Sequence, residues 1–215
     1  MNIIETTQSY VKRRLLTELS PQDAAYRYTH TLRVADIGQK IARAEGLDEE
    51  MLVLACLLHD IGYVACVTNE DYMYHGRISA EIAREFLLSA GYAPEKTESV
   101  CYGILIHTLE EDRLPREATT LERSVSDADN IDRFDAYRLY EMTRWIHPED
   151  TPTGELLAAA QKKVRSLEDL REFPFFTDTA RNLWLDKLDF CAQYFNRLQN
   201  QMEVTLAWDC SPETL

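Results

Sequence analysis

Apolar and polar residues alternate with a helical period along most of the chain, and the clearest run is Leu52 to Gly62. Its inward positions follow the spacing i, i+3, i+4 and i+7 of one helix face, at Leu52, Ala55, Cys56 and His59. The helix ends in His59-Asp60, and Gly62 allows the backbone to loosen there. The pattern therefore predicts a buried helix that brings an imidazole and a carboxylate toward one point.

The same period predicts further helices, with loops between them. We expect helices over 4–19, 20–46, 47–60, 75–91, 97–107, 121–145, 155–170 and 177–204. Ser20 with Pro21, and Asp48, have the side chains that begin helices. Residues 63–74 and 147–154 lack the period and are predicted as loops, and 209–215 as a loose end. In the helix over 75–91 the predicted inner stripe is Ile78, Ile82 and Phe86.

Length and composition agree with a helical protein that has one large domain, or a main domain with a small appendage, and one core is the simpler reading. The chain has 215 residues, 45% of them hydrophobic, with only seven Gly and seven Pro. We therefore predict an all-α fold.

Net charge and cysteine usage limit the partners. The formal charge is −14, from 37 acidic and 23 basic residues, which disfavours a nucleic acid polymer as partner. No basic leader precedes an apolar core, and no apolar run approaches the roughly 18 residues that cross a membrane. Five cysteines without zinc-type spacing indicate reduced thiols. We expect a cytoplasmic protein with no membrane partner.

Four of the five histidines fall on predicted inward faces: His30, His59, His75 and His107. Asp60 joins them from a helix end and Asp129 from a helix margin. One inward histidine is usually an ordinary core residue, and an Asp after it can simply cap the next segment. Burying all six groups together is costly unless a cation pairs with them. Nitrogen and oxygen donors suit Mn²⁺, Fe²⁺, Co²⁺, Ni²⁺ or Zn²⁺, and six donors suit two ions bridged by Asp60.

Five separated motifs carry a family resemblance. They are His30-Thr31-Leu32-Arg33-Val34, Leu57-Leu58-His59-Asp60-Ile61-Gly62, His75-Gly76 with Ser79-Ala80, Ile104-Leu105-Ile106-His107 and Asp127-Ala128-Asp129. Their order, over about 26–135, resembles the HD-domain superfamily of metal-dependent phosphohydrolases. The helices over 155–204 resemble the C-terminal cap of small bacterial stand-alone HD hydrolases. This resemblance implies one HD-type helical domain over 1–215, with a core over about 20–145 and C-terminal helices over about 155–204 packed on it.

The resemblance also implies roles for individual residues. The first metal would be held by His30, His59, Asp60 and Asp129. His75 and His107 match positions that hold a second metal or contact substrate phosphate, so one or two ions are expected. Asp129 is chosen over Asp127 because the ligand of the family corresponds to the Asp after Ala. Arg33 is a candidate phosphate contact or a salt-bridge partner. Tyr63, Tyr72 and Tyr74 either line the mouth of a site or only pack.

The implied activity is hydrolysis of a phosphate ester or anhydride in a small, nucleotide-like molecule by a metal-activated water, with Asp60, His75, His107 and Arg33 as the catalytic candidates. Asn130 and the run Arg133–Tyr137 depart from related hydrolases, which weakens transfer of substrate identity. Two alternatives stay open. A four-His, two-Asp set also resembles the di-iron HD oxygenases of the inositol oxygenase type, and a non-catalytic metal- or nucleotide-binding module would have the same fold.

Overall fold

The protein is all-α in the part of the chain that the structure describes, which confirms the predicted fold class. The structure is a computed structural model that describes residues 2–143 and 150–208, and no strand occurs among them. The chain divides into two compact units. The first runs to Asp132 and includes Phe175–Ala180, and the second holds Arg133–Pro174 and continues from Arg181. The predicted assembly of the whole chain into one domain, with the C-terminal helices packed on the core, stays a prediction.

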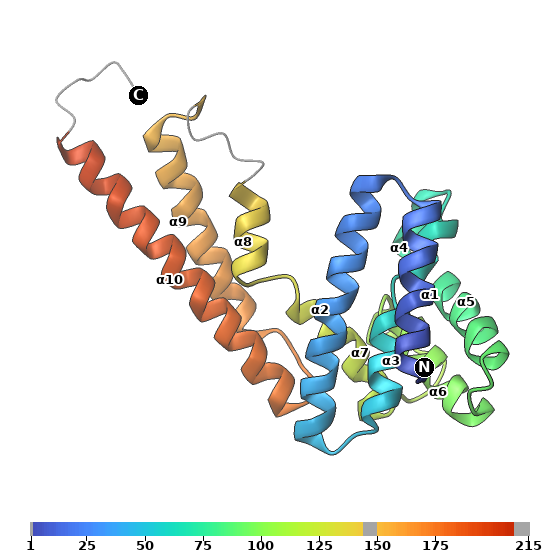
Figure 1. The fold of residues 1–215 in the computed structure, drawn as a ribbon. Coiled ribbons are helices and arrows are strands. Elements are labelled where there is room, and N and C mark those ends of the chain that lie inside the picture. The colour runs from blue at the N-terminus through green and yellow to red at the C-terminus, as the bar shows by residue number, and fades with distance from the viewer. Residues whose placement is uncertain (1, 144–149, 209–215) are drawn as a thin grey trace. The chain divides into compact units, whose positions relative to one another are not determined.

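The helices of the first unit follow the predicted order (Figure 1). They are α1 Ile3–Glu18, α2 Pro21–Glu45, α3 Glu49–Leu58, the 3₁₀ helix η1 Ile61–Ala65, α4 Asn69–Met73, α5 His75–Ser89, α6 Pro94–Ile106, the 3₁₀ helix η2 Glu111–Arg113 and α7 Thr120–Ile131. The predicted caps are confirmed, since the Ser20 and Asp48 side chains accept backbone N–H groups at the starts of α2 and α3. Helix α6 begins at Pro94, three residues before its predicted start at Thr97.

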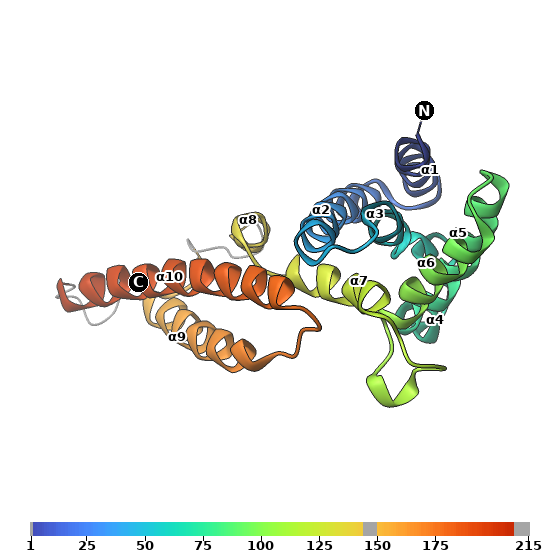
Figure 2. The ribbon, with the colours of Figure 1, turned by 90° about the horizontal axis from the view of Figure 1, so that it is seen from below.

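Helix α3 is the centre of this unit. It contacts α1, α2, α5, α6 and α7, and every residue from Leu52 to Leu58 is buried. Figure 2 shows α2 and α3 side by side, almost end-on. The helix stops at Leu58, and the chain passes through His59 and Asp60 into η1. The predicted buried helix with a loosened end is confirmed.

The predicted loop over 63–74 is wrong, because η1 and α4 occupy most of it. Helix α4 begins with a reciprocal cap, in which the Thr68 hydroxyl accepts the Asp71 N–H and the Asp71 carboxylate accepts the Thr68 N–H. Such a cap stabilises a single turn of helix without an apolar stripe. A helix of five residues is too short to show a period.

The predicted inner stripe of α5 is also wrong. The buried residues are Gly76, Ser79, Ala80, Ala83 and Leu87, whereas Ile78, Ile82 and Phe86 are only half-buried. Close approach of backbones selects the small residues. A Cβ on Gly62 would lie 2.7 Å from the Ser79 backbone nitrogen, and one on Gly76 would lie 2.8 Å from the Ile104 carbonyl oxygen. Two glycines therefore let η1 and α6 lie against α5 with their backbones almost touching.

The predicted long helix over 121–145 is wrong, because it is broken after Ile131. Helix α7 ends there, a second helix α8 spans Ala136–Thr143, and Asp135 adopts a positive φ of 125°. No glycine or proline marks this break in the sequence. The Asp132 carboxylate binds His30 and Arg33 instead of facing solvent, so tertiary contacts hold the end of α7.

The second unit contains α8, α9 Thr153–Asp169, the 3₁₀ helix η4 Leu170–Glu172 and α10 Asp178–Trp208, with α9 and α10 side by side in both views (Figures 1 and 2). Trp184 lies at its centre, and its indole N–H donates to the Leu170 carbonyl at 2.9 Å. On α10, Leu188 and Phe195 are buried, whereas Phe190 is 43% exposed.

Three predictions fall partly or wholly outside the described residues. They are the last two residues of the helix over 121–145, the loop over 147–154, described only from residue 150, and the end 209–215. Among the helices that are described, none is both long enough and apolar enough to span a bilayer.

Candidate metal centre

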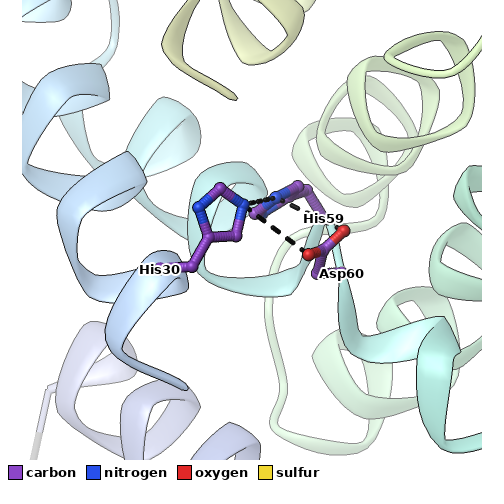
Figure 3. Close-up of side chains that lie close together, drawn as sticks. All are labelled: His30, His59 and Asp60. Atoms are coloured by element: carbon purple, nitrogen blue, oxygen red, sulfur yellow. Dashed lines mark hydrogen bonds and ion pairs between the residues drawn. The ribbon is translucent and has the colours of Figure 1, made fainter. Parts of the chain in front are cut away.

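Four imidazoles from four helices converge through their Nε2 atoms. His30 lies within α2, His59 follows α3, His75 begins α5 and His107 follows α6. The Nε2 atoms of His59 and His30 are 3.3 Å apart, and those of His75 and His107 are 3.1 Å apart. Figure 3 shows His30, His59 and Asp60 turned toward one another. The predicted convergence of all four inward histidines is confirmed.

The Nδ1 atoms of three of these rings are held by the backbone. Nδ1 of His59 lies 2.8 Å from the Cys56 carbonyl oxygen, and His75 and His107 make the same contact with Tyr72 and Ile104 at 2.9 and 2.5 Å. Each acceptor is three residues earlier, in the last turn of a helix, where carbonyl groups lack a helical partner. A carbonyl can only accept, so Nδ1 carries the proton and Nε2 of the neutral ring keeps its lone pair.

Asp60 lies between the two histidine pairs and is 3% exposed. Its Oδ1 is 2.9 Å from Nε2 of His75 and 3.5 Å from Nε2 of His59, while its Oδ2 is 3.6 Å from Nε2 of His30. Its side chain makes no capping bond at the start of η1, so the alternative that Asp60 only caps the next segment is wrong. One carboxylate thus presents an oxygen to each side of the cluster.

Asp129 completes the set, and Asp127 lies elsewhere. Oδ1 of Asp129 is 3.1 Å from Nε2 of His30 and 3.6 Å from that of His59. Asp127 is buried and accepts the Phe176 N–H at 3.1 Å. The structure therefore brings the second aspartate of Asp127-Ala128-Asp129 to the cluster.

Three overlapping groups of donors have the spacing of a metal site, with ligand atoms within 4.8 Å of one another. They are His30, His59 and Asp60; His59, His107 and Asp129; and Asp60, His75 and His107. All six predicted ligands are included. Nitrogen and oxygen donors of this kind fit a divalent transition ion, and Asp60 belongs to a group on each side.

The protonation of the cluster is strongly polarised. Burial alone would lower the pKa of His30, but hydrogen bonds to Asp129 and Asp132 raise it to about 10. Burial, together with the His59 charge, lowers the pKa of His107 to about 4. Burial opposes ionisation of Asp60, yet the charges of His59 and the bond from His75 hold the pKa of Asp60 well below its usual range. The carboxylates thus favour the protonated forms of His30 and His59, whereas His107 stays neutral.

Asp132 has a role that the sequence did not assign. Its Oδ2 lies 2.8 Å from Nδ1 of His30, and it accepts two bonds from the Arg33 guanidinium, at 2.8 and 3.0 Å. Asp132 lies four residues after Ala128 and seven after Val125, so a carboxylate on an apolar stripe was the available signal. Arg33 is thus a salt-bridge partner, and its contact with phosphate stays a prediction.

Arg27 is the second unexpected residue at the cluster. Its Nη1 donates to Oδ2 of Asp60 at 2.9 Å, and its guanidinium carbon is 3.4 Å from the centre of the Tyr63 ring. That ring also lies 4.3 Å from the His75 ring. The signal in the sequence was the position of Arg27 three residues before His30, which puts Arg27 and His30 on one helix face.

Comparisons with known proteins agree with this fold. A model of the HD domain family matches residues 27–133. A crystal structure from an uncultured Thermotogales bacterium, described as a predicted HD superfamily hydrolase, is 20% identical, with a TM-score of 0.63 over 94% of this chain and 99% of its own. A crystal structure of an HD-superfamily hydrolase from Bacillus thuringiensis is 19% identical, with a TM-score of 0.63 over 93% of this chain and 96% of its own.

Bacillus subtilis YpgQ is 21% identical, with a TM-score of 0.58 over 93% of this chain and 97% of its own. No curated protein sequence matches the chain. The matched range contains His30, His59, Asp60 and Asp129, and it ends one residue after Asp132. The chain is an HD-domain protein, with its HD domain over residues 27–133.

Proposed function

We propose that this protein is a metal-dependent phosphohydrolase that cleaves a phosphate ester or anhydride in a small, nucleotide-like molecule. The observation that carries the proposal is the convergence of four Nε2 atoms on Asp60 and Asp129, with the Nδ1 atoms bound from behind. Two similar structures are named HD-superfamily hydrolases, which supports hydrolysis as the class of reaction.

The proposed cofactor is one or two divalent ions of Mn, Fe, Co, Ni or Zn, which the nitrogen and oxygen donors would suit. His30, His59, Asp60 and Asp129 would hold the first ion, and His75 and His107 would share Asp60 with the second. Such an ion supplies a Lewis acid for phosphoryl oxygens and makes nearby water more acidic.

The residues of the chain orient the groups of the site. The carbonyl groups behind His59, His75 and His107 fix the planes of these rings, so that Nε2 points into the site without a proton. Asp60 orients groups on both sides through its two oxygens. If one ion is held, His75 and His107 would contact the substrate phosphoryl group instead.

Partners follow from the same chemistry. A small phosphorylated molecule can reach a cationic centre inside a protein of net charge −14, whereas a nucleic acid polymer would meet the negative surface. The substrate is therefore a small molecule, with neither a nucleic acid polymer nor a membrane as partner.

A metal analysis combined with a hydrolysis screen tests the proposal. The protein is purified without chelator, its metals are quantified, and phosphate release is measured from nucleotides, sugar phosphates and an aryl phosphate with each candidate metal. Metal-dependent phosphate release that is lost in Asp60→Ala supports the proposal. Bound iron with O₂ uptake and no phosphate release would assign the di-iron oxygenase, and metal binding without either reaction would assign a binding module.

A further inference from the structure

We infer that Arg27 binds the phosphoryl group of the substrate through its planar guanidinium. This inference rests on the phosphohydrolase function proposed above and adds a residue that recognises the substrate. The Arg27 guanidinium donates directly to Asp60, the carboxylate between the two histidine pairs. The sequence pointed instead to Arg33, whose Nε and Nη2 are both bonded to Asp132.

The position of Arg27 connects the buried cluster with solvent. Its Nη1 is 2.9 Å from Oδ2 of Asp60, which is 3% exposed, while the Arg27 side chain is 24% exposed. Arg27 and His30 lie one turn apart on α2, so the guanidinium lies beside the imidazole that faces the same carboxylate. A group entering from solvent could therefore contact Arg27 and the cluster together.

The guanidinium is also held in a fixed plane. Its carbon lies 3.4 Å from the centre of the Tyr63 ring, and the Tyr63 ring packs 4.3 Å from the His75 ring. A stacked guanidinium keeps its N–H groups directed outward in its own plane, and this flat fork matches two oxygens of a phosphate. Tyr63 thus packs between Arg27 and His75 and orients the guanidinium. Arg27 and His30 face Oδ2 of Asp60, whereas His75 faces Oδ1.

Charge gives the strongest reason for an anion at this place. Asp132 is matched by Arg33, which leaves Asp60 and Asp129 to balance a metal. Two carboxylates balance one divalent ion, so the charge of Arg27 is then in excess, and a second ion increases the excess. Asp60 lies between Arg27 and such an ion, but its single negative charge is shared by both, so the site as a whole stays positive. A phosphoryl group supplies the negative charge that balances it.

A purely structural role for Arg27 makes different predictions. If Arg27 only neutralised Asp60, it would compete with the metal, and its removal would tighten metal binding without changing phosphate binding. If it binds phosphate, its removal weakens phosphate binding while the metal content stays the same. The two roles therefore separate in two independent measurements.

The experiment uses the full chain loaded with Mn²⁺ and three variants. Arg27→Met removes the charge, Arg27→Lys keeps the charge without the fork, and Arg43→Met is the control. Arg43 lies on the same helix, pairs with Glu49 and is 62% exposed on its side chain. Metal content is measured first, then the Kd of inorganic phosphate by calorimetry, and then kcat and KM for a phosphate ester that the wild type hydrolyses.

We expect Arg27→Met to raise the phosphate Kd and the KM about 10- to 100-fold, as loss of hydrogen bonds to a charged group implies, with the metal content unchanged. Arg27→Lys should restore only part of this affinity, and Arg43→Met should match the wild type. A wild-type phosphate Kd in Arg27→Met, or loss of its metal, would overturn the inference. If Arg27→Met does not fold, a wild-type Kd in Arg27→Lys overturns it instead.

Failure of the inference and failure of the proposed function are distinguishable. A wild type that releases phosphate, with an unchanged Kd and KM in Arg27→Met, would remove Arg27 and leave the phosphohydrolase. A wild type that hydrolyses no phosphate compound but binds phosphate through Arg27 would remove the phosphohydrolase and leave the anion site.

Discussion

The two kinds of support behind the histidines divide the cluster into a local side and a long-range side. His59, His75 and His107 each donate Nδ1–H to a carbonyl three residues earlier, so each helix end orients its own ring. His30 instead faces Asp132, which is 102 residues away. The orientations of His59, His75 and His107 are therefore fixed by local backbone contacts, whereas the orientation of His30 depends on how the end of α7 packs against α2.

The chemistry of the two sides also differs. A neutral carbonyl fixes a ring without adding charge, whereas a carboxylate makes the ring a stronger base and a stronger metal donor. The pKa of His30 is raised to about 10 although burial opposes it, because Asp129 and Asp132 bind the ring. The pKa of His107, which has a carbonyl behind it, is lowered to about 4 by burial and by His59. His30 should therefore be the strongest single anchor of a cation.

Asp60 is shared by both sides, so its loss should have the largest effect. We expect Asp60→Ala to remove the metal and to lower phosphate release by at least about 1,000-fold, since several kcal/mol of stabilisation of the transition state depend on the ion. Metal analysis and a phosphate assay check this. Full metal content with full turnover in this variant would show that the cluster is not the site.

Asp132→Asn tests the long-range side alone. The amide can still accept the Nδ1–H of His30, but it has no charge to strengthen the ring or to hold Arg33. We expect metal affinity to fall about 10- to 100-fold, as for other groups that act behind a ligand. Metal affinity is measured by titration of this variant and, in parallel, of Arg33→Gln, whose metal affinity should fall less. Wild-type affinity in Asp132→Asn would remove the distinction between the two sides.

His107→Ala tests the local side and the number of ions. If His75 and His107 share Asp60 in holding a second ion, the variant should lose one equivalent of metal, while the ion at His30 and His59 stays bound. Equilibrium titration followed by metal analysis gives the stoichiometry. An unchanged stoichiometry with a lower kcat would instead place His107 on the substrate.

Asp127→Asn should have the smallest effect on activity and a visible one on stability. Burial raises the pKa of Asp127 to about 7, although the Phe176 N–H and Arg123 favour ionisation. The folded state therefore binds this proton more tightly than the unfolded chain, whose carboxyl has a pKa of about 3.9. Stability from this group is complete below about pH 4 and is lost as the pH rises through about 7.

The asparagine keeps an oxygen that can accept the Phe176 N–H and carries no charge. The variant should match the wild type near pH 4 and exceed it by about 1–3 kcal/mol at pH 8, when both are unfolded with urea. Phosphate release should stay near that of the wild type. A variant that is less stable at pH 8, or that loses its activity, would contradict this assignment of Asp127.

The inward direction of the four histidines could be predicted from the sequence because local patterns specify it, whereas the choice of Asp129 over Asp127 needed the family resemblance. Each of His59, His75 and His107 lies at a helix end, where the apolar period and the backbone decide its direction. The role of Asp132 could not be predicted, since it depends on a break that no glycine or proline marks. The stripe of α5 was assigned to the large apolar residues, but the close approach at Gly62 and Gly76 selects small ones.

The return of the chain to the first unit at Phe175–Ala180 affects how this unit can form during synthesis. The Phe176 N–H donates to Asp127 at 3.1 Å and the Thr179 N–H donates to Glu45 at 3.0 Å, so both contacts need residues made after α9. A nascent chain that has just left the ribosome as far as Asp132 already carries all six donors. The two contacts that complete the first unit can form only after translation has passed Thr179.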